Sequence, residues 1–141
     1  MISSDAPLAI SYDKEWWSLW SARFEDPLSD AESFRQQGGQ LLTIGEQVQT
    51  REEIEGQYMG LLKFTPEGWQ RVSAVLAGLS AEQINKLDMT SLLRLLLSHG
   101  VPIASIAISG GWVEVDNPSD ITLYEQRVAD LGWSHNWRTD T

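Results

Sequence analysis

The sequence predicts a mixed α/β fold with an added β-hairpin, and three observations support this prediction. Short apolar runs alternate with amphipathic helical patterns in the second half of the chain, as they do where helices cover a sheet. Gly38-Gly39 separates two alternating segments and favours a tight hairpin turn. The 141 residues are 42% hydrophobic and 21% charged, which suits one globular domain. We therefore expect a single domain over residues 1–141.

The chain begins with a predicted strand and a predicted helix. Residues 7–12 are expected to form the strand, with Leu8 and Ile10 as its apolar positions. Residues 14–24 are expected to form the helix, and Asp13 can cap its start. Its apolar stripe, spaced as a helix requires, consists of Trp16, Trp17, Leu19, Trp20 and Phe24.

A hairpin and a further strand are predicted next. The hairpin spans residues 33–46, and the polar residues 47–55 are expected to form an exposed loop or a single helical turn. Residues 57–64 are a compact apolar run between a glycine and a proline, which favours a buried strand. Gly60 within this run is typical of a strand that a ligand or another backbone approaches closely.

Capping signals indicate where the next three helices begin. Thr65 followed by proline opens the first. Ser80 and Gln83 have the spacing of a capping box and open the second. Thr90 is expected to cap the third, which a glycine ends. The expected buried face of the first of these helices consists of Trp69, Val72, Val75, Leu76 and Leu79.

The last part of the chain contains strand, turn and helix signals. Residues 101–109 are an apolar strand, two glycines interrupt it, and residues 112–115 are predicted to resume it. Asn117 followed by proline opens the last helix. Residues 132–141 carry two tryptophans and little regular pattern, and we expect an exposed tail. The expected apolar face of the last helix consists of Ile121, Tyr124, Val128 and Leu131.

Composition and charge exclude several classes of function. Twenty acidic residues against ten basic ones give a net charge of −10, without a cluster of lysine and arginine. We therefore expect neither nucleic acid nor a membrane surface as a partner. The absence of cysteine removes disulfides, thiol nucleophiles and thiolate metal sites. The sequence shows neither a signal-peptide pattern nor an apolar run long enough to span a bilayer, so a cytoplasmic location is expected.

Histidines and carboxylates are the remaining candidates for chemistry. His99 ends a leucine-rich helix and is expected to interact with its C-terminus, whereas His135 is expected in the exposed tail. Their spacing does not indicate a zinc site. Asp116 follows the predicted strand 112–115 and precedes a helix, where α/β sheets bind ligands. Its role is either that of a magnesium ligand or that of a turn or capping residue. Asp120 is expected to be a first-turn acid favoured by the helix dipole.

Three segments carry a resemblance to a known family. They read GQYMGLLKFTPEGW at residues 56–69, DMTSLLRLLLSHG at 88–100 and GGWVEVDNPSDI at 110–121. In this order they resemble the C-terminal half of the nucleotidyltransferases that activate sugar phosphates, phosphocholine or aminoethylphosphonate. The stretch SYDKEWWSLWSARFEDPLSDAESF is similar to the middle of such a chain, so the resemblance covers nearly all of residues 8–130. The pattern GGWxEVDxPxD is its most specific part.

The resemblance implies a fold, a reaction and a set of site residues. The implied fold is a partial Rossmann-like, nucleotidyltransferase-type mixed sheet with flanking helices. In the implied reaction an oxygen of a small phosphorylated or phosphonate acceptor attacks the α-phosphorus of an NTP, CTP being favoured, and pyrophosphate leaves. Two aspartates hold Mg²⁺ in such enzymes, and Asp116 matches the C-terminal one. The residues expected to bind the acceptor are Gln57, Tyr58, Gly60, Trp112 and Glu114.

The sequence also departs from the family pattern. It lacks the LAAGxGxR-like nucleotide loop and the first metal aspartate, and residues 45–48 read GEQV where the family has a lysine-proline pair. We therefore expect the acceptor- and metal-binding half of such an enzyme, inactive alone. The alternative is a stand-alone binding or assembly module derived from that fold. Apolar strands without partners predict a homodimer, unless the hairpin and the tail fold back to cover them.

Overall fold

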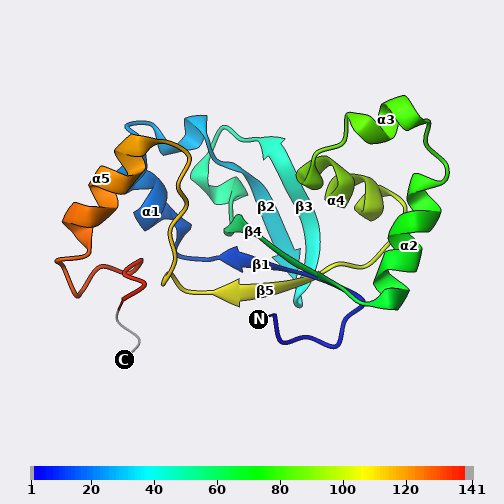
Figure 1. Cartoon of the computed structure of the whole chain (residues 1–141), viewed down its shortest axis with the longest axis horizontal. Coiled ribbons are helices and arrows are strands. Elements are labelled where there is room, and N and C mark those ends of the chain that lie inside the picture. The colour runs from blue at the N-terminus through cyan, green and yellow to red at the C-terminus, as the bar shows by residue number, and fades with distance from the viewer. Residues whose placement is uncertain (1, 139–141) are drawn as a thin grey trace.

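A five-stranded mixed sheet in the order β2-β3-β5-β1-β4 forms the centre of the fold (Figure 1). The computed structural model of the chain describes residues 2–138. The strands are β1 (Leu8–Asp13), β2 (Glu32–Gln37), β3 (Gln40–Gln47), β4 (Gln57–Phe64) and β5 (Ala104–Ile108). The helices are α1 (Trp16–Arg23), α2 (Pro66–Leu76), α3 (Ala81–Asn85), α4 (Met89–Ser98) and α5 (Pro118–Arg127). The mixed α/β fold predicted from the sequence is thus confirmed.

Strand β1 has a partner on each side and is buried along its whole length. It pairs in parallel with β5 and antiparallel with β4, and each of its six residues is buried. The predicted hairpin is formed by β2 and β3, and both residues of its glycine turn have positive φ angles. It joins the sheet through β5, and Leu41 N–H donates to the carbonyl of Ile103, just before β5, at 2.8 Å.

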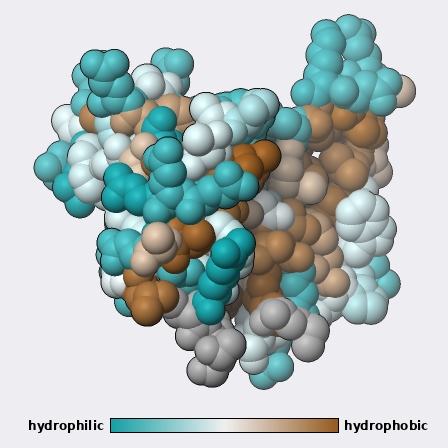
Figure 2. Space-filling view, turned by 60° about the vertical axis from the view of Figure 1, so that its left-hand side comes forward, coloured by the Kyte–Doolittle hydropathy of each residue, from teal (hydrophilic) through white to brown (hydrophobic). Residues whose placement is uncertain are grey.

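Helices cover the sheet as two separate groups, α2 to α4 at one end and α1 with α5 at the other (Figure 1). Each group encloses its own apolar cluster, and each fully buried leucine or isoleucine contributes about 1.5–3 kcal/mol. The cluster under α2 and α4 contains Leu8, Ile10, Phe34, Ile44, Val72, Leu93, Leu96 and Ile103. The cluster around α1 and α5 contains Trp16, Leu19, Trp20, Ile54, Tyr124 and Trp133. Figure 2 brings the α1–α5 end forward and shows its surface as largely hydrophilic.

Most of the predicted helix starts are confirmed by cap geometry. Thr65 accepts a hydrogen bond from Gly68 N–H, and Ser80 and Asn117 each form a capping box. The prediction for Thr90 was wrong, because Asp88 caps α4 by accepting from Ser91 N–H at 2.7 Å. An aspartate two residues earlier competes successfully, since its carboxylate is a strong acceptor for an N-terminal N–H group.

Two strand predictions need correction. Residues 57–64 form an edge strand, β4, instead of a strand buried on both faces, and Gly60 is exposed with φ of 78°. Residues 112–115 pair with no strand in the described part of the chain. The reason lies in Gly110 and Gly111, whose φ angles of 62° and 74° turn the backbone away from the sheet after β5.

Two predicted apolar faces also need correction. Trp69 is 53% exposed and contacts the Phe64 ring on the edge strand, with 6.1 Å between ring centroids. Ile121 is exposed, whereas Tyr124 on the same helix is buried, and Leu131 lies exposed beyond the end of α5. Single exposed apolar side chains are common on protein surfaces, so helical spacing alone overestimated these faces.

Within the described part of the chain, which leaves out residues 139–141, the segment after α5 is not the exposed tail that its composition predicted. It folds back against α5 and the end of β1, with Trp133 and Asn136 buried and His135 fully enclosed. Tyr124 stacks on Trp133, with 6.0 Å between the ring centroids. No helix within residues 2–138 combines the length and the apolar character that crossing a membrane requires.

Candidate functional site

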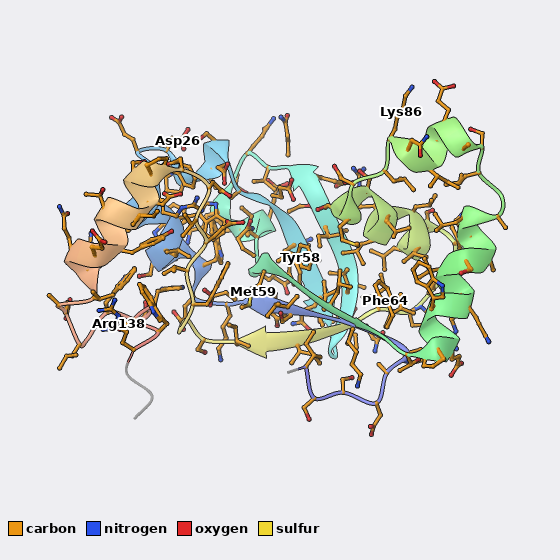
Figure 3. The ribbon with its side chains drawn as sticks, in the orientation of Figure 1. Asp26, Tyr58, Met59, Phe64, Lys86 and Arg138 are labelled. Atoms are coloured by element: carbon orange, nitrogen blue, oxygen red, sulfur yellow. The ribbon has the colours of Figure 1, made fainter. Side chains whose placement is uncertain are left out.

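A pocket of about 290 Å³ lies between the two groups of helices, where β2 and β4 meet α1 and the segment that precedes α5. Four carboxylates and three aromatic rings give it an acidic, partly aromatic wall. Figure 3 shows Tyr58 near the middle of the molecule, on β4. The pocket is lined by Trp20, Asp30, Glu32, Ser33, Phe34, Ile44, Gln57, Tyr58, Thr90, Glu114 and Asp116.

A larger groove, of about 560 Å³, lies between β3 and the helices α3 and α4. Five of its twelve lining residues are leucines, and its charged groups are Glu46 and Arg94, whose side chains lie 3.5 Å apart. The smaller pocket has more of the convergent polar groups that orient a ligand. We therefore take the smaller pocket as the candidate site.

Arg23 joins the acidic side of this pocket to α1. Its guanidinium is completely buried and contacts Glu114 at 3.1 Å and Asp116 at 2.8 Å. It also donates two hydrogen bonds to Asp120, at 3.2 and 3.0 Å. One cation thus serves three carboxylates, two of which line the pocket. The cluster holds the segment before α5 against the last turn of α1.

The charges of this cluster shift the protonation of its members. Hydrogen bonds from Arg23 lower the pKa of Asp120, against the effect of burial. Burial raises the pKa of Glu114, and the nearby charge of Asp116 adds to this effect, although Arg23 opposes it. On the opposite wall, burial also raises the pKa of Glu32, helped by Asp88 and Asp30. The pocket wall therefore holds carboxylates that destabilise one another's charged forms and gain from a cation.

The link between Arg23 and Asp120 predicts a specific response to acid. The lowered pKa means that the Asp120 carboxylate stabilises the fold above its unfolded pKa of about 3.9. This contribution is lost as the pH falls through the lower, folded pKa. We expect Asp120→Asn to lose less unfolding free energy than the parent between about pH 5 and pH 2.5, measured by urea unfolding. The exposed Asp5→Asn control should keep the parent profile, and parallel profiles for both variants would contradict the prediction.

The structure brings together some of the residues that the sequence singled out. Gln57, Tyr58, Glu114 and Asp116 all line the pocket. Gln57 is buried, and its amide donates to the carbonyl of Glu32 at 2.8 Å, so it also braces β2 against β4. Burial raises the pKa of the Tyr58 hydroxyl.

Two of the residues expected to bind the acceptor lie outside the pocket lining. Gly60 faces open space on β4, since a Cβ added there would meet no atom within 4 Å. The Trp112 indole instead donates its Nε1–H to Asp13 at 2.8 Å. Trp112 lies behind the pocket, with its ring 6.4 Å from that of Trp20.

Sequence reasoning missed Arg23, although the helix pattern held a signal for it. Arg23 lies four residues after Leu19 and seven after Trp16, both of which are buried on the inner face of α1. A cation on an apolar helix face must find anionic partners, because an unpaired buried charge is costly. Asp120 was recognised only as a favourable first-turn acid; it is also the most buried partner of that cation.

The carboxylates of the pocket can be tested as magnesium ligands. No group of three histidine, cysteine, aspartate or glutamate side chains in residues 2–138 is arranged to hold a metal ion. Mg²⁺ usually needs only one or two carboxylates, with waters and substrate phosphates completing its shell. The Asp116 side chain is 57% exposed and that of Glu114 is 41% exposed. Both can therefore contribute oxygens to an ion that enters with a phosphate.

Comparison with known proteins adds a relative to this geometry. No family model matches the chain. Over 129 residues it is 34% identical to the CTP:phosphoglutamine cytidylyltransferase of Campylobacter jejuni. This chain is similar to a cytidylyltransferase. The match covers 87% of this chain and 51% of the relative, so the chain spans about half the length of the protein it matches. The similarity to nucleotidyltransferases expected from the sequence is thereby confirmed.

Proposed function

We propose that the chain is the acceptor- and metal-binding part of a magnesium-dependent nucleotidyltransferase. The transferred group comes from an NTP, with CTP favoured, and the acceptor is a small phosphorylated or phosphonate compound. One observation carries the proposal: in a chain similar to a cytidylyltransferase, one pocket is lined by Gln57 and Tyr58 from β4 and by Glu114 and Asp116 from the segment before α5. The chain is expected to be inactive alone, because it lacks the glycine-rich nucleotide loop.

The charge of the pocket supports the metal requirement. Asp30, Glu32, Glu114 and Asp116 line it, and Arg23 behind the wall offsets only part of their charge. A phosphate group that approaches these four carboxylates meets electrostatic repulsion. With a divalent cation bound to it, the phosphate would be attracted to the carboxylates instead of repelled. Asp116 and Glu114 are the residues that would hold Mg²⁺, which offsets charge on the transferring phosphoryl group when bound.

The proposed reaction forms one bond and breaks one. An oxygen of the acceptor's phosphate or phosphonate attacks the α-phosphorus of the NTP, and pyrophosphate leaves with the bridging oxygen. Tyr58 and Gln57 line the β4 side of the pocket, where they would position the acceptor, and Glu114 and Asp116 would hold a cation that accompanies the phosphates. Trp20 and Phe34 add apolar rings to the lining of the same pocket.

A stand-alone binding or assembly module without catalysis is the second candidate. The observation that favours it is the contact of Arg23 with both carboxylates that would hold the metal, Glu114 and Asp116. A homodimer also remains a prediction of ours. The edge strand β4 and the exposed Leu61 and Trp69 support it, because they offer unpaired backbone and apolar surface to a second chain.

Asp116→Asn tests the proposed function. We expect the variant to bind phosphorylated compounds about tenfold more weakly or worse in the presence of Mg²⁺, since one ligand oxygen loses its charge. Folding should change little, because Asp116 is exposed. Isothermal titration with Mg²⁺ and a panel of small phosphorylated molecules, with and without CTP, measures this.

Asp26→Asn is the matched control, since Asp26 lies exposed on the loop after α1 (Figure 3). It should bind as the parent does. Equal affinity in the folded Asp116→Asn variant would contradict a metal role for Asp116. Binding to the parent that does not depend on Mg²⁺ would favour the module without catalysis.

A further inference from the structure

The carboxylate of Asp13 lies at the end of β1 and is the acceptor for four donors. Glu15 N–H donates to it at 2.8 Å, Gly110 N–H at 3.0 Å and the Trp112 indole at 2.8 Å. The fourth partner is His135, whose Nε2 lies 2.5 Å from Asp13 Oδ2. Both the Asp13 and the His135 side chains are completely buried. A buried charge that accepts hydrogen bonds from four donors holds the segments that carry those donors firmly in place.

These four donors come from three different segments of the chain. Glu15 precedes α1, which carries Trp20 and Arg23. Gly110 and Trp112 begin the segment that carries Glu114 and Asp116 to the pocket. His135 belongs to the tail, which contacts the same segment again where Gly111 N–H donates to the Ser134 carbonyl at 2.9 Å. Asp13 is thus the point at which α1, the pocket segment and the tail are joined.

We propose that Asp13 and His135 are positioning residues that hold the segment from Gly110 to Asp116, and with it the carboxylates of the pocket, in place. Neither residue lines the pocket, so they act through Trp112 and the backbone of Gly110. The inference rests on the proposed function only for its ligand readout; the geometry of the segment can be measured without any ligand.

The hydrogen-bond pattern explains why this charge is kept inside the protein. Burial by itself raises the pKa of Asp13, but the hydrogen bonds from His135, Gly110, Trp112 and Glu15 together lower it. The carboxylate is therefore ionised and only accepts, so His135 Nε2 carries the proton of their shared bond. Removing this donor leaves a buried charge short of one partner, and the segment that supplies the other donors must shift to compensate.

The test compares three histidine variants by amide and indole NMR. His135→Phe keeps a ring and removes the donor, whereas His135→Gln keeps a donor close to the position of Nε2. The exposed His99→Phe is the matched control. We expect His135→Phe to shift the amide signals of residues 110–116 and the Trp112 indole signal, and to weaken Mg²⁺ binding about tenfold. His135→Gln should recover most of both effects, and His99→Phe should show neither.

Several outcomes would overturn the inference. One is a folded His135→Phe variant in which the signals of residues 110–116 and the Trp112 indole keep their parent positions. Another is a glutamine variant as perturbed as the phenylalanine variant, because ring shape would then matter and the hydrogen bond would not. If His135→Phe does not fold, Trp112→Phe removes a different donor to the same carboxylate. Unchanged amide signals of residues 113–116 and an unchanged His135 ring signal in that variant would also overturn the inference.

The same experiment separates this inference from the proposed function. A parent chain that binds no Mg²⁺ contradicts the proposed function, and the NMR signals of the variants still decide the role of Asp13 and His135. A parent that binds Mg²⁺, together with variants that bind equally well and show unchanged signals, supports the function and overturns the positioning role.

Discussion

Replacing Arg23 with methionine is expected to lower the free energy of unfolding by about 3–5 kcal/mol, the usual effect of removing one partner from a buried ion cluster. The guanidinium is fully buried against Glu114, Asp116 and Asp120. Methionine fills much of the same volume but leaves three neighbouring carboxylates without their cation. Asp120 suffers most, because its side chain is only 5% exposed and cannot turn to water.

Urea unfolding monitored by tryptophan fluorescence measures this loss. Arg71→Met is the matched control, since Arg71 makes an exposed helix pair with Glu67 at 2.7 Å. This variant should lower the free energy of unfolding by less than about 0.5 kcal/mol, because exposed ion pairs of this kind contribute little. Losses of similar size in the two variants would show that the buried cluster contributes no more than a surface pair.

Local signals in the sequence predicted much of the fold. The caps Thr65, Ser80 and Asn117 begin their helices as expected, because a cap and its N–H partner lie within three residues of each other. The turn at Gly38-Gly39 is equally local, since two positive φ angles select a tight hairpin. These elements depend on few contacts with the rest of the chain.

Features that depend on distant partners were not predictable from local pattern. Residues 112–115 alternate like a strand, but a strand needs a neighbour, and the two glycines turn this segment away from the sheet. The burial of His135 depends on its contact with Asp13, which lies at the other end of the sequence. The local pattern around His135 therefore predicted only an exposed tail. Arg23 belongs to the same class, since its three anionic partners all follow residue 113.

The candidate site was only partly predictable, because the fold brings residues from distant parts of the sequence into its wall. Gln57, Tyr58, Glu114 and Asp116 lie in segments of the chain that carry the family resemblance, and they line one pocket. Trp20 from α1, Asp30 from the loop before β2 and Glu32 from β2 also line it. No spacing in the sequence relates these three residues to Asp116, because the sheet order and the Arg23 cluster bring them together.

Gly110→Ala is expected to lower the free energy of unfolding by about 2–5 kcal/mol, from two separate costs. Gly110 has φ of 62°, a conformation that costs alanine about 1–2 kcal/mol. A Cβ at this position would lie 2.0 Å from the backbone oxygen of Ser134. Backbone cannot move aside as a flexible side chain can, so the tail must leave its place or the turn must open, which adds about 1–3 kcal/mol.

The neighbouring glycine separates these two costs. Gly111 has φ of 74°, and a Cβ there would meet no atom within 4 Å, so Gly111→Ala should cost only the conformational part, about 1–2 kcal/mol. Urea unfolding of both variants gives the difference, and limited proteolysis reports whether the tail is released in Gly110→Ala alone. Equal losses, with a protected tail in both, would contradict the close approach of Ser134. A larger loss at Gly110 would show that the first glycine of the GGWVEVD segment is required because the tail packs directly against it, at the same turn whose N–H donates to Asp13.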